Sequence, residues 1–172
     1  RMKLTTKQLT LCALLTAMAL ALSYLENLFP LSLAIPIPGV KLGLANIVTL
    51  FALYALGAEQ ALLILLSRCL LGALFAGNIN ALFFSLLGGL CAMGAMIVLS
   101  RRQVLSVYGV SVGGAAAHNC GQIAAAMLTL GSSAPLYYLP VMLAVSLLTG
   151  GLTGLAAACL FQGLSHTDLM KG

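Results

Sequence analysis

Long apolar stretches, separated by short breaks, dominate the chain. A helix that crosses the hydrocarbon core of a membrane needs about 20 predominantly apolar residues, and most of these stretches approach that length. The breaks contain proline, glycine or arginine. Proline and glycine interrupt or end a helix, and arginine is unfavourable in the hydrocarbon core. Six transmembrane helices are predicted, over residues 6–28, 42–56, 58–75, 80–99, 104–130 and 136–164. The chain, residues 1–172, is therefore predicted to be a single all-α integral membrane domain.

Two of the predicted helices depart from the usual spanning length. The helix over 42–56 is short, and it follows a turn containing Pro36 and Gly39, which do not favour a continuous helix. The segment 104–130 would be about 40 Å long at a rise of about 1.5 Å per residue, which exceeds the hydrocarbon core. We expect this segment to begin in the membrane interface or to bend near Gly113.

Composition also indicates a membrane protein. The chain is 62% hydrophobic and only 6% charged, whereas a soluble domain carries about 25% charged residues to keep its surface solvated. The formal net charge of +5 does not indicate nucleic-acid binding, because the basic residues stand mostly at the ends of predicted helices. We therefore expect the protein to lie in membrane lipid and to bind no nucleic acid.

Lysine and arginine in the short connections predict the orientation of the bundle. One side of a six-helix arrangement carries Lys3, Lys7, Arg101, Arg102 and Lys171, and the other carries Lys41. Cytoplasmic loops are enriched in these residue types. Both termini are therefore predicted to be cytoplasmic, and the connection that carries Lys41 is predicted to be external.

Arg68 lies within the third predicted helix, where an arginine costs roughly 2.5–3.5 kcal/mol on insertion scales. The obvious carboxylate partners are missing, because Glu26 and Glu59 fall near helix ends and Asp168 is in the C-terminal tail. Arg68 therefore binds an anion, bonds to backbone carbonyl groups or extends toward the membrane surface. The first of these interpretations makes it a candidate binding residue.

The fifth predicted helix carries three polar side chains close together, His118, Asn119 and Gln122. His118 and Gln122 are four residues apart and share a face, with Asn119 one step around the helix. Lipid offers no hydrogen-bond partners, so these side chains need partners in the protein or in a ligand. They form either a structural network between helices or part of a binding site at the depth of Arg68.

Other polar residues fall toward the external side in the same arrangement, and we predict that they converge with Arg68 on one pocket open to that side. The predicted lining residues are Lys41, Asn46, Arg68, Asn78, Asn80, His118, Asn119 and Gln122. The pocket would hold two cations and no nearby acid other than Glu26, which suits a small molecule that is anionic or strongly hydrogen-bonding. The alternative for Lys41 is an ordinary loop in which the lysine meets lipid headgroups.

No metal site or redox pair is predicted. The five cysteines stand singly in apolar stretches, with no CxxC motif and no histidine at ligand spacing. Buried cysteine behaves as a small hydrophobic residue. We interpret all five as packing residues and expect no cofactor.

Several segments resemble a known family. They read GVKLGLANIVTLFALY, LLSRCLLGALFAG, FSLLGGL, AAAHNCGQ and LYYLPVMLAVSLLTGGLTGL. They are similar to the bacterial Gx transporter family, often labelled heptaprenyl diphosphate synthase component I, over about Thr6 to Leu164. That family is grouped with the substrate-binding S components of energy-coupling factor (ECF) transporters. The resemblance implies a multi-pass protein of the bacterial cell membrane that takes up a small solute, such as a vitamin or an isoprenoid precursor.

Ala13, Ala17 and Ala21 form a stripe of small residues along the first predicted helix. Such a stripe lets another helix approach closely, and packing inside this bundle is the simplest interpretation. The resemblance implies instead that the three alanines meet the helices of a separate transmembrane coupling subunit. Separate ATP-binding subunits would then supply the energy for uptake.

The synthase label can be tested against the chemistry of the chain. Prenyl diphosphate synthases hold Mg²⁺ and diphosphate with aspartate-rich motifs, because a hard cation requires carboxylate oxygens. The chain has one aspartate and two glutamates, and it has no Walker A motif for ATP hydrolysis. We therefore expect no catalytic residues and no enzymatic activity. A non-catalytic membrane subunit of a prenyl diphosphate or quinone biosynthesis system is the alternative function, and a solute carrier without partner subunits is a third.

Overall fold

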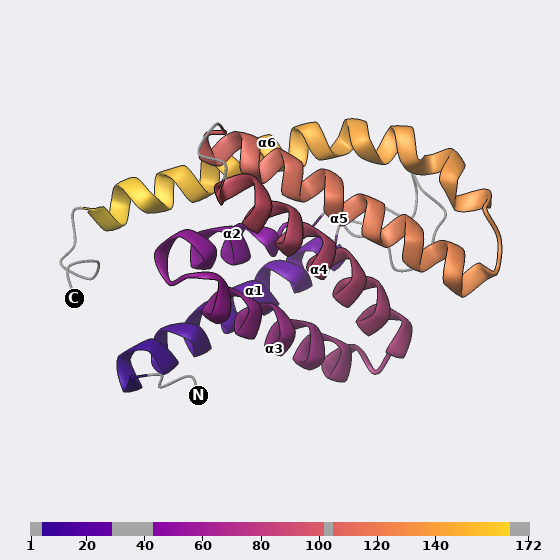
Figure 1. The fold of residues 1–172 in the computed structure, drawn as a ribbon. Coiled ribbons are helices and arrows are strands. Elements are labelled where there is room, and N and C mark those ends of the chain that lie inside the picture. The colour runs from indigo at the N-terminus through magenta and orange to yellow at the C-terminus, as the bar shows by residue number, and fades with distance from the viewer. Residues whose placement is uncertain (1–4, 29–42, 102–104, 166–172) are drawn as a thin grey trace.

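A computed structural model describes residues 5–28, 43–101 and 105–165. This part of the chain is helical and contains no β-strand (Figure 1). Its elements are α1 (Thr6–Leu28), α2 (Asn46–Ala55), α3 (Ala58–Ala76), α4 (Ile79–Arg101), α5 (Val107–Leu130), the short 3-10 helix η2 (Ala134–Tyr138) and α6 (Leu139–Ser165). The predicted all-α fold is confirmed for the described residues.

Four helical segments are long and apolar enough to cross a membrane, namely α1, α3, α4 and the stretch from η2 through α6. α2 is too short, since its 10 residues extend over only about 15 Å. α5 has 24 residues and continues as helix through Gly113, but its polar side chains and glycines make it less apolar. By length and composition, four helices of the described part of the chain can span a membrane, and the six spanning helices stay a prediction.

The helix boundaries differ from the predicted ones at the start of α2, α5 and α6. α2 begins only at Asn46, because Gly43 has a φ of 83° and the chain turns there, with the Asn46 amide bonded to the Gly43 carbonyl oxygen. α5 begins after Ser106, whose hydroxyl accepts a hydrogen bond from the Gly109 amide and caps the helix. α6 begins at Leu139, after the η2 turn.

The three C-terminal helices pack with their backbones close together. A Cβ atom on Gly121 of α5 would lie 2.8 Å from the carbonyl oxygen of Leu87 in α4, and one on Gly150 of α6 would lie 2.6 Å from Cα of Val112 in α5. Helices approach this closely only where the facing residue has no side chain. Gly121 and Gly150 therefore lie inside the bundle.

Bulky apolar side chains join the N-terminal helices instead. The buried cluster at their centre includes Leu15 of α1, Phe51 of α2 and Ile64 and Leu65 of α3. α2 lies in the middle of the fold and contacts each of the other five α-helices. Its position brings the polar residues near its amino end against the rest of the bundle.

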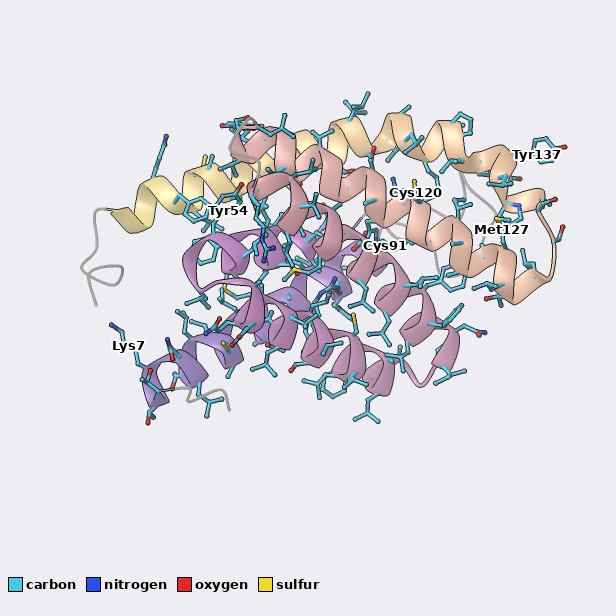
Figure 2. All side chains as sticks on the ribbon, in the orientation of Figure 1. Lys7, Tyr54, Cys91, Cys120, Met127 and Tyr137 are labelled. Atoms are coloured by element: carbon cyan, nitrogen blue, oxygen red, sulfur yellow. The ribbon has the colours of Figure 1, made fainter. Side chains whose placement is uncertain are left out.

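The ribbon shows which helix ends share one end of the bundle. The beginning of α1, the end of α4, the beginning of α5 and the end of α6 lie together, and the α3–α4 turn and η2 lie at the opposite end (Figure 1). Lys7 and Tyr54 lie toward the first end, and Tyr137 lies at the second (Figure 2). This arrangement agrees with the prediction that the beginning of the first helix and the end of the last helix lie on one side of the bundle. The assignment of that side to the cytoplasm stays a prediction.

Candidate binding site

Arg68 is buried in the middle of the bundle, on α3. Its side chain is 7% exposed, and its Nη2 atom donates a hydrogen bond of 3.2 Å to Oδ1 of Asn46, the first residue of α2. The Arg68 Nε atom is also buried and has no hydrogen-bond partner among the described residues. The guanidinium is therefore held on one atom by a neutral amide, and a second donor is unsatisfied.

His118 and Gln122 approach the same region from α5. They are 3% and 1% exposed, and both lie against Gly88 of α4. A Cβ atom on Gly88 would lie 2.9 Å from Cε1 of His118 and 3.1 Å from Cγ of Gln122, and one on Gly89 would lie 3.5 Å from Nη2 of Arg68. Gly88 thus leaves the space that the His118 side chain occupies, and Gly89 lies beside the Arg68 guanidinium.

Gly43 closes the group from the side of α2. A Cβ atom there would lie 2.9 Å from Nδ2 of Asn46 and 3.2 Å from Cδ2 of His118. The Gly43 amide donates a hydrogen bond to the carboxylate of Glu26, which is buried near the end of α1. Glu26 therefore helps to position the turn that precedes α2.

Five polar residues from four helices thus meet in the bundle interior, and we call them the polar cluster: Glu26, Asn46, Arg68, His118 and Gln122. Four of them are among the predicted binding residues. Glu26 is the addition, and the sequence offered a signal for it, because a carboxylate within an apolar helix needs a partner. Its place near a predicted helix end argued against an ion pair with Arg68, although Glu26 was the one acid expected to come near the pocket.

Three other predicted binding residues lie elsewhere. Asn119 donates a hydrogen bond of 2.6 Å from Nδ2 to the carbonyl oxygen of Met142, so it joins α5 to α6. Asn78 and Asn80 are exposed at the α3–α4 turn, where Asn78 Oδ1 accepts from the Asn80 amide. Lys41, the remaining predicted residue, lies outside the described residues.

The alanine stripe of α1 faces outward. Ala13, Ala17 and Ala21 are exposed, whereas Ala19 is fully buried in the core. Packing inside this bundle therefore does not explain the three alanines. Their predicted contact with a coupling subunit stays a prediction.

The cysteines divide into two groups. Cys12 and Cys69 are buried in the core, as expected for packing residues, and Cys91, Cys120 and Cys159 are exposed. Cys91 and Cys120 project from α4 and α5 (Figure 2), so the packing interpretation is wrong for the exposed cysteines. Within the described part of the chain, no group of three histidine, cysteine, aspartate or glutamate residues is arranged to hold a metal ion.

The chemistry available to the polar cluster is that of hydrogen bonding and charge. Arg68 supplies donors in a planar fork that matches a carboxylate or phosphate group, and the amides and imidazole of the other members supply neutral donors and acceptors. The Glu26 carboxylate is bonded to a backbone amide. The described residues therefore suit the binding of an oxyanion and do not assemble a set of carboxylates for a hard cation.

The fold and the cluster define a helical membrane protein with a polar centre. Residues 15–160 match the sequence profile of a family described as heptaprenyl diphosphate synthase component I. The chain belongs to this family. Comparison with curated proteins and with solved structures gave no match.

Proposed function

We propose that this protein is a membrane-embedded binding subunit that holds a small anionic solute at the polar cluster. Arg68 carries the proposal, because it is a buried cation whose hydrogen bond within the described chain goes to the neutral amide of Asn46. An unpaired charge inside a protein is costly, and buried charges are normally paired. An oxyanion bound at Arg68 would supply that missing partner.

In this proposal the subunit serves uptake, and separate chains supply the energy. A transmembrane coupling subunit would meet α1, whose exposed Ala13, Ala17 and Ala21 allow close helix contact. ATP-binding subunits would drive the cycle, since the sequence contains no Walker A motif. The binding subunit itself would be non-catalytic.

A second function is favoured by the family to which the chain belongs, whose description names a component of heptaprenyl diphosphate synthase. In that case the protein would be a non-catalytic membrane subunit of a prenyl diphosphate system. The same oxyanion chemistry would serve it, because a diphosphate offers the oxygens that an arginine fork binds. The two functions therefore differ in the bound molecule and in the partner chains.

Native mass spectrometry of the protein purified in a mild detergent tests the proposal. We expect the wild-type protein to retain an anionic small molecule, Arg68→Ala to lose it, and Arg101→Ala to keep it. Arg101 is a matched control because it is an exposed arginine in the last turn of α4. Equal retention by the wild-type protein and Arg68→Ala would contradict the proposal, as would the absence of any anion from all three.

The mass of the retained molecule separates the two functions. A water-soluble carboxylate or phosphate ester supports uptake, and a prenyl diphosphate supports the biosynthetic role. Proteoliposomes that contain this chain with coexpressed ATPase and coupling subunits provide the second measurement. ATP-dependent accumulation of the retained molecule is expected only for the uptake function.

A further inference from the structure

One edge of the Arg68 guanidinium is only partly used. In arginine the Nε–H group and one N–H of Nη2 point along the same edge, and together they bind a carboxylate or phosphate through two parallel hydrogen bonds. Here Nη2 donates to Oδ1 of Asn46 at 3.2 Å, and Nε has no partner in the described part of the chain. The amide of Asn46 therefore occupies half of the edge that an oxyanion would bind.

A second unsatisfied atom lies one turn further along α2. The Thr49 side chain is fully buried, and its hydroxyl has no hydrogen-bond partner among the described residues. Asn46 and Thr49 are three residues apart on a helix and so share a face. Long and polar helical side chains lean toward the amino end of the helix, which directs Thr49 toward the turn that carries Asn46.

We propose that Asn46 is displaceable, and that an entering oxyanion takes its place on the Nε–Nη2 edge of Arg68. This inference rests on the proposed function and adds the exchange that accompanies binding. The displaced Asn46 amide then accepts a hydrogen bond from the Thr49 hydroxyl. One movement satisfies both buried atoms, the Arg68 Nε donor and the Thr49 hydroxyl.

The relative strength of the bonds favours the exchange. Arginine and an oxyanion carry opposite charges and form two parallel hydrogen bonds, each with a donor–acceptor distance of about 2.7–2.9 Å. The 3.2 Å contact of Arg68 with a neutral amide is longer than that. The ligand class that completes the exchange is a compact oxyanion, a carboxylate or a phosphate, whether it belongs to a free solute or to a lipid headgroup.

Nuclear magnetic resonance of ¹⁵N-arginine-labelled protein in phosphatidylcholine nanodiscs observes the Arg68 Nε–H group, whose signal reports whether an oxyanion has replaced Asn46. Arg68→Lys identifies the signal, and acetate and inorganic phosphate are the probes. We expect either probe to shift the wild-type Nε signal. A shift produced by adding phosphatidylglycerol to the nanodiscs, with no probe, supports the exchange with a lipid headgroup as the occupant.

Asn46→Asp and Asn46→Ala give opposite expectations. Asn46→Asp places a carboxylate on the edge that does not leave, so probe affinity should fall by about tenfold or more. Asn46→Ala removes the competing acceptor, so probe affinity should stay the same or rise. Asn46→Ser, whose shorter side chain does not reach Arg68, provides the same measurement if Asn46→Ala does not fold.

Thr49→Val tests the second half of the exchange. Removal of the hydroxyl should lower the affinity for the probe by about threefold to tenfold, which corresponds to one neutral hydrogen bond. Thr153→Val is the matched control, because its hydroxyl is bonded to Ser111 on α5, and it should leave the affinity unchanged. Unchanged affinity in Thr49→Val would overturn the proposed acceptor role of the displaced amide.

The remaining outcomes separate the two proposals. In one outcome the wild-type protein binds a probe, and Asn46→Ala and Asn46→Ser lower the probe affinity as strongly as Arg68→Ala does. Asn46 is then a direct ligand contact. The exchange is then wrong and the proposed function stands. If no probe or lipid shifts the wild-type Nε signal, the exchange and the oxyanion site both fall.

Discussion

The two halves of the bundle are held together in different ways. α4, α5 and α6 approach backbone to backbone at glycines such as Gly121 and Gly150, and their buried polar groups bond to one another, as in the Ser111–Thr153 pair at 2.6 Å. α1, α2 and α3 meet through bulky side chains, and the unsatisfied Thr49 hydroxyl and Arg68 Nε atom both lie in this half. The comparison teaches that the C-terminal half is a frame held by close backbone contact, whereas bulky side chains hold the N-terminal half, in which two buried polar atoms are left for the proposed ligand.

The largest expected effect breaks the C-terminal frame. Gly150→Ala places a Cβ atom 2.6 Å from Cα of Val112, so α5 and α6 must separate, and overpacking of this kind lowers stability by about 1–3 kcal/mol. Gly151→Ala is the matched control, because a Cβ atom there meets nothing within 4 Å. Thermal unfolding of both variants in detergent measures the difference. Equal melting temperatures would show that the close approach is not needed.

The next effect concerns ligand affinity in the N-terminal half. Arg68→Ala removes a charge-assisted contact and should weaken binding of the retained anion by roughly tenfold to a hundredfold. The loss of folding stability should be smaller than the loss of binding free energy, because the substitution also removes a buried charge. Titration calorimetry and thermal unfolding of Arg68→Ala and His118→Ala measure both quantities. Unchanged affinity with a strongly lowered melting temperature would make the polar cluster structural.

The sequence predicted the cluster better than it predicted the helix starts. Arg68, His118 and Gln122 could be placed together because each is a strongly polar residue at mid-helix, where lipid offers no partner. Asn119 is one step around α5 from His118 and so faces α6, where it bonds to Met142. Choosing between these two faces requires the positions of the neighbouring helices.

The start of α2 shows why boundaries were harder to predict. The apolar stretch is continuous through Leu44 and Ala45, so hydropathy does not mark where the helix begins. The structure sets the boundary through the left-handed conformation of Gly43 and its hydrogen bond to Glu26. That bond joins residues 17 positions apart, and no local pattern predicts it.

A smaller effect compares one threonine from each half. Thr153→Val removes a hydroxyl bonded to Ser111 and should lower stability by about 0.6 kcal/mol, and by no more than about 1.7 kcal/mol. Thr49→Val removes a buried hydroxyl without a described partner, so it should leave stability unchanged or raise it slightly. Thermal unfolding of the two variants measures the contrast. A larger loss for Thr49→Val than for Thr153→Val would remove the distinction between the halves.

The smallest effect on stability is expected at the surface of α1. Ala17 is exposed, so Ala17→Leu should leave the melting temperature unchanged, within about 0.5 kcal/mol. The added volume should prevent close contact with a coupling helix and abolish copurification with the coexpressed coupling subunit. Leu14→Ala is the control on the same exposed surface. Normal assembly of Ala17→Leu would exclude the stripe as the partner contact.

The shortness of α2 has an electrostatic consequence. A helix carries about half a positive elementary charge at its amino end, and α2 begins at the buried residue Asn46 inside the bundle. This partial charge lies beside the Arg68 guanidinium, which contacts Asn46. The Glu26 carboxylate, which accepts a hydrogen bond from the Gly43 amide, offsets part of the combined positive charge. Within the described residues, the proposed anion would therefore meet a positive potential from a helix dipole as well as from a side chain, and substitution of Arg68 would remove only one of these sources.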